Sequence, residues 1–142
     1  KRILPESKGL DFGSGPGPTL GLMFEEKGHH VSNYDLYYDH HPERFDTQYD
    51  FITTTETVEH LSRPGVELDR LWSCLKEGGW LGIMTLRIPR DQPFIEWHYR
   101  NDDTHITFFS DQTFQWLGRY WNSNPEFVGE RVVLFQKESS TK

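Results

Sequence analysis

The sequence is short of the residues that would support a disulfide framework, a cysteine-rich metal cluster or a membrane span. Cys74 is the only cysteine among 142 residues, so no internal disulfide can form and a zinc site built on cysteine pairs is excluded. No stretch approaches the roughly 20 apolar residues that a membrane helix needs, and the N-terminus lacks the apolar core of a signal peptide. We therefore expect a cytoplasmic protein that makes no use of a membrane.

Positive charge is also scarce. Lys and Arg number 15 against 22 Asp and Glu, which gives a formal net charge of -7. Such a surface repels polyphosphates, so nucleic acid is a poor partner and a small-molecule substrate is favoured. The acidity otherwise fits ordinary solubility, and the sequence gives no indication of the oligomeric state.

Internal repeats and low-complexity linkers are absent, and the 35% hydrophobic content suits one core. We expect a single domain over residues 1–142, truncated at its N-terminus because the chain starts at Lys1 without a methionine. Short apolar runs alternate with helical patterns, which is typical of a parallel sheet. The expected fold class is therefore α/β.

Apolar periodicity and the positions of Gly and Pro predict the individual elements. The expected strands are 9–12, 31–35, 49–55, 79–86, 126–129 and 131–136. The expected helices are 19–27, one with Pro64 in its first turn that ends at Gly78, and one capped by Ser110. The nearly continuous apolar run 79–86 predicts a central strand covered on both faces. Residues 36–49 leave room for one helical turn around 42–45, 87–107 form a long polar and aromatic loop, and 138–142 form a frayed tail.

The most informative motif is a glycine loop, Asp11-Phe12-Gly13-Ser14-Gly15-Pro16-Gly17, placed between the first expected strand and the first expected helix. Alone it could be an ordinary turn, but its glycines also allow bare backbone to approach a ligand closely. A dinucleotide fold requires Gly-x-Gly-x-x-Gly, and the third glycine position holds Pro18. Asp11 would repel a pyrophosphate and attract an ammonium group. Asp35, about 20 residues further on, can accept hydrogen bonds from ribose hydroxyls, so the pair predicts a site for an adenosine that carries an amino-acid tail.

Three further segments are informative when they are taken together with the glycine loop: Tyr49-Asp50-Phe51-Ile52, Glu56-Thr57-Val58-Glu59-His60 and Leu75-Lys76-Glu77-Gly78-Gly79. With the glycine loop and Asp35, they make most of the chain resemble the class I S-adenosylmethionine-dependent methyltransferases. The resemblance implies a Rossmann-like three-layer sandwich, a mostly parallel sheet with an antiparallel closing strand and a shortened third-strand region. It also implies S-adenosylmethionine as the cofactor. The predicted cofactor-binding residues are Asp11, Gly13, Ser14, Gly15, Asp35, Leu36 and Glu56.

Two features depart from the family pattern. The passage after Asp35 is too short for the usual full helix and third strand, so the adenine contact would come from residues 36–38 or the site would be partly open. The family also has a helix before the glycine motif that closes over the cofactor, and only residues 1–7 remain in its place.

The segment from Glu56 to His60 follows the expected strand 49–55, so it should lie on the same rim as the glycine loop. Glu56 can face the cofactor tail, and His60 can act as a general base near neutral pH. The segment also resembles the Glu-x-x-Glu-His of ubiquinone-pathway O-methyltransferases, where it can hold a divalent metal. We favour proximity to cofactor or substrate and predict no metal ligand. The alternative is a solvated Glu59 and a His60 that packs against the loop.

The other concentration of chemistry-bearing side chains is residues 97–110, where aromatics can bind an apolar acceptor and His105 is a second candidate base. Trp97, Phe108 and Phe109 can equally complete the core. The predicted function is methyl transfer from S-adenosylmethionine to a small-molecule acceptor, with an oxygen acceptor favoured and with His60 and His105 as the catalytic residues. Two alternatives remain open: a catalytically degenerate methyltransferase-like binding domain, and a nucleotide-dependent oxidoreductase.

Overall fold

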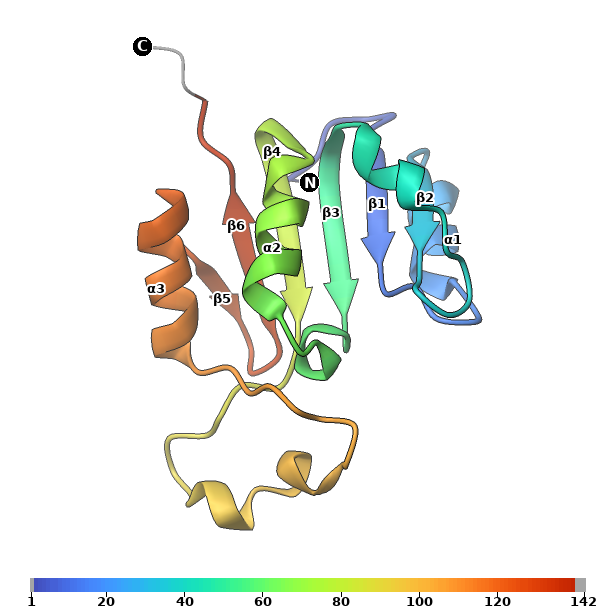
Figure 1. The fold of residues 1–142 in the computed structure, drawn as a ribbon. Coiled ribbons are helices and arrows are strands. Elements are labelled where there is room, and N and C mark those ends of the chain that lie inside the picture. Colours follow the sequence, from blue (N-terminus) through green and yellow to red (C-terminus); the bar gives the residue numbers. More distant parts are fainter. Residues whose placement is uncertain (1, 140–142) are drawn as a thin grey trace.

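A computed structural model describes residues 2–139, which form a six-stranded sheet and three α-helices (Figure 1). The strands are β1 (Lys8–Phe12), β2 (His30–Tyr34), β3 (Tyr49–Thr55), β4 (Leu75–Met84), β5 (Glu126–Val128) and β6 (Val132–Gln136). The helices are α1 (Thr19–Glu26), α2 (Pro64–Ser73) and α3 (Asp111–Trp121), with short 3-10 turns η1 (Pro42–Asp46), η2 (Val58–His60), η3 (Phe94–Glu96) and η4 (His98–Asn101). Residues 140–142 of the expected tail lie outside the described residues.

The strand order is β2-β1-β3-β4-β6-β5. The pairs β1–β2, β1–β3 and β3–β4 are parallel, whereas β6 pairs antiparallel with both β4 and β5. The predicted α/β fold with a mostly parallel sheet and an antiparallel closing part is confirmed. After β1 the chain first forms β2 on one side and then crosses to β3 on the other, and ligands of open α/β sheets bind at such a reversal.

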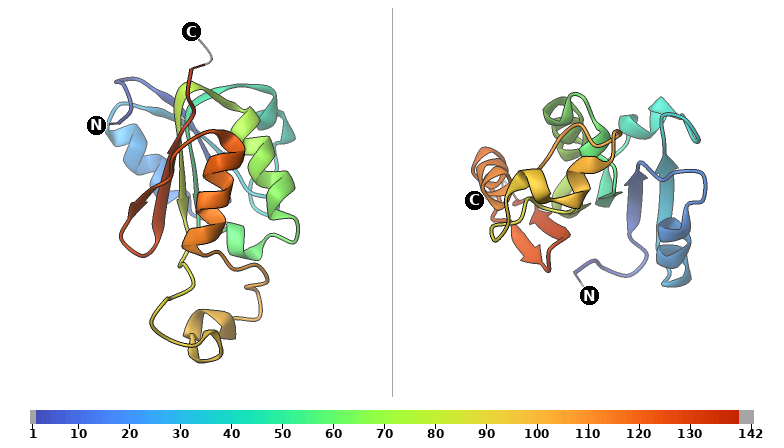
Figure 2. Two further views of the ribbon diagram at one scale, coloured as in Figure 1. Left: turned by 90° about the vertical axis from the view of Figure 1, so that its left-hand side faces the viewer. Right: turned by 90° about the horizontal axis from the view of Figure 1, so that it is seen from below.

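The helices form two unequal layers. Figure 2 shows α1 on one face of the sheet and α2 with α3 on the other. Leu81 and Ile83 of β4 are fully buried in one cluster with apolar residues of α2 and α3. Trp80 and Met84, which alternate with them, are only half-buried. The prediction that this strand is central is confirmed, but only one of its faces is fully covered, because α2 and α3 lie on that face whereas α1, on the other face, packs beside β2.

The end of α2 differs from the prediction. The helix ends at Ser73 rather than at Gly78, and residues 75–78 open β4. The cause is pairing with β3: the Tyr49 N–H donates to the Cys74 carbonyl at 2.8 Å, and Tyr49 lies opposite Leu75. Gly78 instead takes a φ of +81° where the β3–β4 register shifts.

The expected cap of α3 is confirmed. The Ser110 hydroxyl accepts from the Thr113 N–H at 3.2 Å, and the Thr113 hydroxyl accepts from the Ser110 N–H at 3.3 Å, which is a capping box. Within the described residues no helix is long and apolar enough to span a bilayer.

The long loop between β4 and α3 lies below the carboxyl ends of the parallel strands (Figure 1). It has a small apolar cluster of its own, in which Trp97 and Tyr99 are buried and Phe108 is partly buried. Phe109 is buried in the main core. Trp97 and Phe109 therefore serve packing, which is one of the two roles that the sequence left open for them.

Candidate active site

Three predicted segments meet at one rim of the sheet. The glycine loop follows β1, Asp35 follows β2 and Glu56 follows β3. Because these strands are parallel neighbours, their carboxyl ends lie side by side (Figure 1). The loop before α3 lies next to this rim, so residues far apart in the sequence are brought to one end of the sheet.

Gly13 and Gly15 both have a positive φ, but their surroundings differ. Gly13 has a φ of +81°, and a Cβ there would lie 2.1 Å from the Thr57 hydroxyl oxygen, so only glycine fits. Gly15 has a φ of +71°, but a Cβ there would meet nothing within 4 Å. The backbone is therefore packed against the protein at Gly13 and open at Gly15.

Hydrogen bonds fix the shape of this loop. The N–H groups of Gly13 and Ser14 donate to the Tyr34 carbonyl at 2.7 and 3.0 Å. The Ser14 hydroxyl oxygen is buried, and no described residue gives it a hydrogen-bond partner. Buried polar atoms are normally paired, so this hydroxyl is suited to meet a polar group of a ligand.

Asp35 organises the rim around its carboxylate. One oxygen accepts from the Gly15 N–H at 2.9 Å, and the other accepts from the N–H groups of Tyr37 and Tyr38 at 2.9 and 3.2 Å. A carboxylate has about four acceptor positions, so capacity for a ligand hydroxyl remains. Leu36, at the turn between these partners, is exposed. Contact of Asp35 and Leu36 with a nucleoside stays a prediction.

Asp11 is a buried carboxylate at the start of the loop. Its Oδ1 accepts from the Thr53 hydroxyl at 3.1 Å. Burial raises the pKa of Asp11, and the nearby Asp35 carboxylate raises it further, while the Thr53 hydrogen bond opposes them. An ammonium group nearby would offset the cost of keeping this carboxylate ionised.

The carboxylates of Glu56 and Glu59 share one phenol. The Tyr99 hydroxyl lies 2.8 Å from Glu56 Oε1 and 2.5 Å from Glu59 Oε2. Burial raises the pKa of Glu56, and the Glu59 carboxylate adds to the effect. Burial also raises the pKa of Tyr99, with further contributions from both carboxylates. Glu59 is fully buried and its Oε1 has no partner among the described residues, so the alternative of a solvated Glu59 is wrong.

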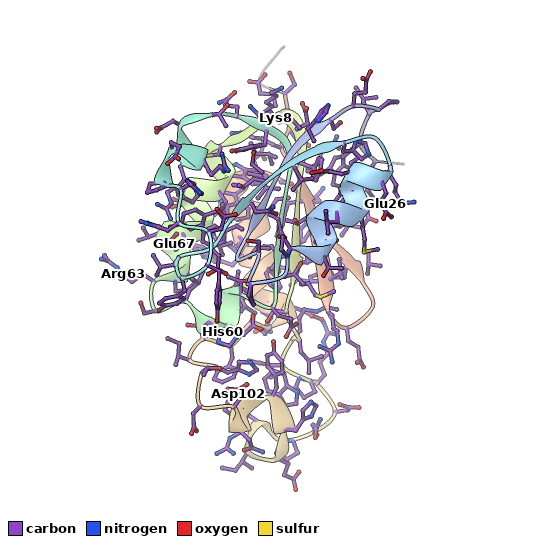
Figure 3. All side chains as sticks on the ribbon, turned by 90° about the vertical axis from the view of Figure 1, so that its right-hand side faces the viewer. Lys8, Glu26, His60, Arg63, Glu67 and Asp102 are labelled. Carbon is purple, nitrogen blue, oxygen red and sulfur yellow. The ribbon has the colours of Figure 1, made fainter. Side chains whose placement is uncertain are left out.

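His60 and His105 are 45 positions apart in the sequence, and the fold brings them together with ring centroids 4.9 Å apart. Figure 3 shows His60 where the sheet meets the segment that carries Asp102. Nδ1 of His60 lies 2.8 Å from the Thr104 carbonyl oxygen, and Nδ1 of His105 lies 2.7 Å from that of Tyr99. A carbonyl only accepts, so each Nδ1 carries hydrogen and a neutral ring has its lone pair at Nε2. Nε2 of His105 lies 3.5 Å from Asp102 Oδ2, and Nε2 of His60 lies 3.9 Å from Glu59 Oε2.

Glu59, His60 and His105 are the group, within the described part of the chain, that could hold a metal ion, since one ligand atom of each lies within 4.8 Å of the others. Glu56 does not belong to this group. The expectation that no metal is used stays a prediction.

Tyr99, Thr57 and Arg131 are site residues that the sequence did not reveal. Tyr99 bridges the two glutamates, Thr57 packs against Gly13, and an Arg131 guanidinium nitrogen lies 3.8 Å from Glu56 Oε2. Tyr99 lies in the aromatic stretch 97–110 and Thr57 in the segment 56–60, both of which the sequence singled out, whereas Arg131 had no signal. The partners of Tyr99 lie about 40 positions upstream, and no spacing rule predicts that contact.

Comparisons with known proteins agree with this fold. A family model described as a methyltransferase domain matches residues 1–122. A search of curated proteins finds no match.

Solved structures give the same result at low sequence identity. An O-methyltransferase family protein from Burkholderia thailandensis superposes with a TM-score of 0.67 at 13% identity, over 94% of this chain and 52% of its own. The 1,6-didemethyltoxoflavin-N1-methyltransferase of the same organism, with bound 1,6-didemethyltoxoflavin and S-adenosylhomocysteine, gives 0.68 at 16%, over 95% and 72%. Human N-acetylserotonin methyltransferase in complex with S-adenosylmethionine gives 0.65 at 13%, over 93% and 48%. The chain thus spans about half the length of the first and third of these proteins.

Proposed function

The chain belongs to the class I S-adenosylmethionine-dependent methyltransferase family, and on that premise we propose that its rim binds S-adenosylmethionine and supports methyl transfer to a small-molecule acceptor. The observation that carries the proposal is the glycine loop: its backbone is open at Gly15, Asp35 fixes its shape, and Asp11 lies buried at its start. These features suit a cationic nucleoside and oppose a pyrophosphate.

Each predicted binding residue has a task in this proposal. The open backbone at Gly15 and the unpaired Ser14 hydroxyl admit the ligand closely, and Gly13 lets the loop pack against Thr57 in the conformation that binds it. Asp11 and Glu56 are the acceptors for a methionyl ammonium. Asp35 and Leu36 line the nucleoside end, where the short passage to η1 leaves Leu36 exposed.

His60 and His105 are the candidate general bases of the reaction. The bound cofactor supplies an electrophilic sulfonium methyl group, so the protein mainly has to align an acceptor and exclude water. An acceptor hydroxyl loses its proton as it becomes methylated, and Nε2 of His60 or His105 can take that proton because Nδ1 of each ring is already held by a carbonyl. We therefore favour an oxygen acceptor.

A calorimetric titration of the protein with S-adenosylhomocysteine and, separately, with NADH tests the cofactor assignment. We expect saturable binding of S-adenosylhomocysteine and none of NADH, since Pro18 replaces the third glycine of a dinucleotide loop. Binding of NADH alone would reject the proposal and support an oxidoreductase.

A second experiment separates an enzyme from a degenerate binding domain. The protein is incubated with S-adenosylmethionine carrying a radioactive methyl group and a small-molecule extract, and labelled products are separated by chromatography. We expect a labelled product. If the cofactor binds and no component accepts the label, the domain binds without catalysis.

A further inference from the structure

We propose that Tyr99 is a positioning residue that couples cofactor binding at Glu56 to the docking of residues 97–107, the segment that carries His105. The inference rests on the proposed function in one respect, because it takes Glu56 as a neighbour of the cofactor's ammonium group. It adds that cofactor binding at Glu56 and docking of the segment with His105 are coupled, and that the Tyr99 hydroxyl connects them.

The Tyr99 hydroxyl joins segments that are distant in the sequence. It reaches Glu56 after β3 and Glu59 in η2 at 2.8 and 2.5 Å, and it lies 3.4 Å from the Thr85 hydroxyl at the end of β4. The Tyr99 side chain itself is buried and packs on the His105 ring with centroids 4.1 Å apart. Movement of this phenol therefore changes its hydrogen bonds to both glutamates and its packing against the His105 ring.

A count of hydrogens gives the direction of the coupling. A phenol has one hydrogen to donate, whereas Tyr99 lies within hydrogen-bond distance of two carboxyl groups. Glu56 and Glu59 therefore compete for it, and their negative charges repel each other. An ammonium group that binds Glu56 supplies it with another donor, so Tyr99 can donate to Glu59 without competition. Cofactor binding should then strengthen the bond between Tyr99 and Glu59.

Glu59 transmits this change to the docked segment through its backbone. Its carbonyl oxygen accepts from the N–H groups of Ile106 and Thr107 at 2.9 and 3.0 Å. The neighbouring Leu61 carbonyl accepts from the Thr107 hydroxyl at 2.7 Å. A continuous chain of contacts therefore runs from Glu56 through Tyr99 and Glu59 to the Ile106 and Thr107 amides, and those amides report on docking.

The test is amide hydrogen exchange followed by NMR, with and without saturating S-adenosylhomocysteine, on the wild-type protein and on Tyr99→Phe. In the wild type we expect the ligand to slow exchange of the Ile106 and Thr107 amides at least about fivefold, the lower end of typical coupling between sites. In Tyr99→Phe the ligand should change that exchange by less than about twofold, and by reciprocity its affinity should be lower than in the wild type.

Tyr49→Phe is the matched control. Tyr49 is also buried, and its hydroxyl donates to the Arg44 carbonyl at 2.7 Å, away from the glutamates. The substitution removes the same atom and a comparable hydrogen bond, so any general loss of stability is reproduced. We expect ligand-induced protection at Ile106 and Thr107 to persist in this variant, which a merely structural role of Tyr99 would not predict.

Two results would overturn the inference: equal protection in Tyr99→Phe and the wild type, or binding to the wild type that leaves the Ile106 and Thr107 amides unchanged. Failure of the wild type to bind S-adenosylhomocysteine would instead reject the proposed function, and the inference with it. If Tyr99→Phe does not fold, Glu56→Ala decides: at saturation it must lose the protection that the wild type shows, and retained protection overturns the coupling.

Discussion

The glycine-loop side and the histidine side of the candidate site are built in different ways. On the first, Asp35 holds the Gly15 N–H across 20 positions of sequence. On the second, Tyr99 meets Glu56 and Glu59 across 43 and 40 positions, and His60 meets the Thr104 carbonyl across 44. The first side depends mainly on the consecutive elements β1, α1 and β2, with contacts from Thr53 and Thr57, and the second depends on how a long loop packs. We therefore expect substitutions on the two sides to have separable effects.

The largest expected effect is on the histidine side. His60→Gln should lower the rate of methyl transfer roughly 10²–10⁴-fold, because Nε2 no longer accepts the acceptor's proton. The affinity for S-adenosylhomocysteine should stay within about twofold of wild type, because the proposed role of His60 is in proton transfer and not in binding the cofactor. Kinetics with the acceptor found in the extract and calorimetry measure the two quantities. His98→Gln, at an exposed histidine of the loop that carries His105, is the control. An equal loss of cofactor affinity in His60→Gln would contradict the separation of the two sides.

Gly13→Ala should have the next largest effect, and the quantity affected should be the affinity for the cofactor. The new Cβ would clash with the Thr57 side chain, and a φ of +81° disfavours any residue with a Cβ by roughly 1–2 kcal/mol. We expect the affinity for S-adenosylhomocysteine to fall on the order of 100-fold, equivalent to about 2.8 kcal/mol. Gly17→Ala, where a Cβ would meet nothing within 4 Å, should bind like wild type. Similar behaviour of the two variants would mean that the shape of the loop is unimportant.

Asp11→Asn should weaken binding by about tenfold, a typical loss for one hydrogen bond to a charged group, and should change the pH dependence of stability. Burial raises the pKa of Asp11 above its ordinary value of 3.8, so the native protein keeps this proton to higher pH than the unfolded chain. Wild-type stability therefore decreases as pH rises through the interval from the ordinary to the raised pKa.

Asparagine does not titrate, so the free energy of unfolding of Asp11→Asn minus that of wild type should increase across this pH interval. Urea unfolding at several pH values measures the difference. A constant difference between the two proteins over that range would show that Asp11 is not perturbed as described.

The smallest expected effect is that of metal removal. Although Glu59, His60 and His105 lie close enough to hold an ion, we expect EDTA to leave both methyl transfer and cofactor affinity within about twofold of the untreated protein, because the histidines serve as bases. A loss of transfer that Zn²⁺ or Mg²⁺ restores would replace that role with metal binding. This result would alter the histidine side alone.

The same contrast explains how much could be predicted from the sequence. The strands β1 to β3, the cap of α3 and the glycine loop depend on local chemistry: apolar runs, a hydroxyl three residues before its partner, and glycines where φ is positive. Asp35 lay at the expected strand end, but its bonds to the Gly15, Tyr37 and Tyr38 amides were not predicted.

What sequence reasoning missed depends on tertiary packing. The end of α2 moved from Gly78 to Ser73 because β3 pairs with residues that could also continue a helix. The sequence left a solvated Glu59 open as an alternative, but Glu59 is buried because a loop from about 40 positions further on covers it with Tyr99. Neither event leaves a periodic signal in the sequence.

A crystal structure of the protein with S-adenosylhomocysteine is the decisive experiment for the cofactor site. We expect the ligand against Gly13–Gly17, with its ammonium group within hydrogen-bond distance of Asp11 or Glu56, its ribose at Asp35, and its sulfur on the side of His60 and His105. A ligand bound elsewhere, or no ligand at the glycine loop at saturating concentration, would show that the site is assigned wrongly.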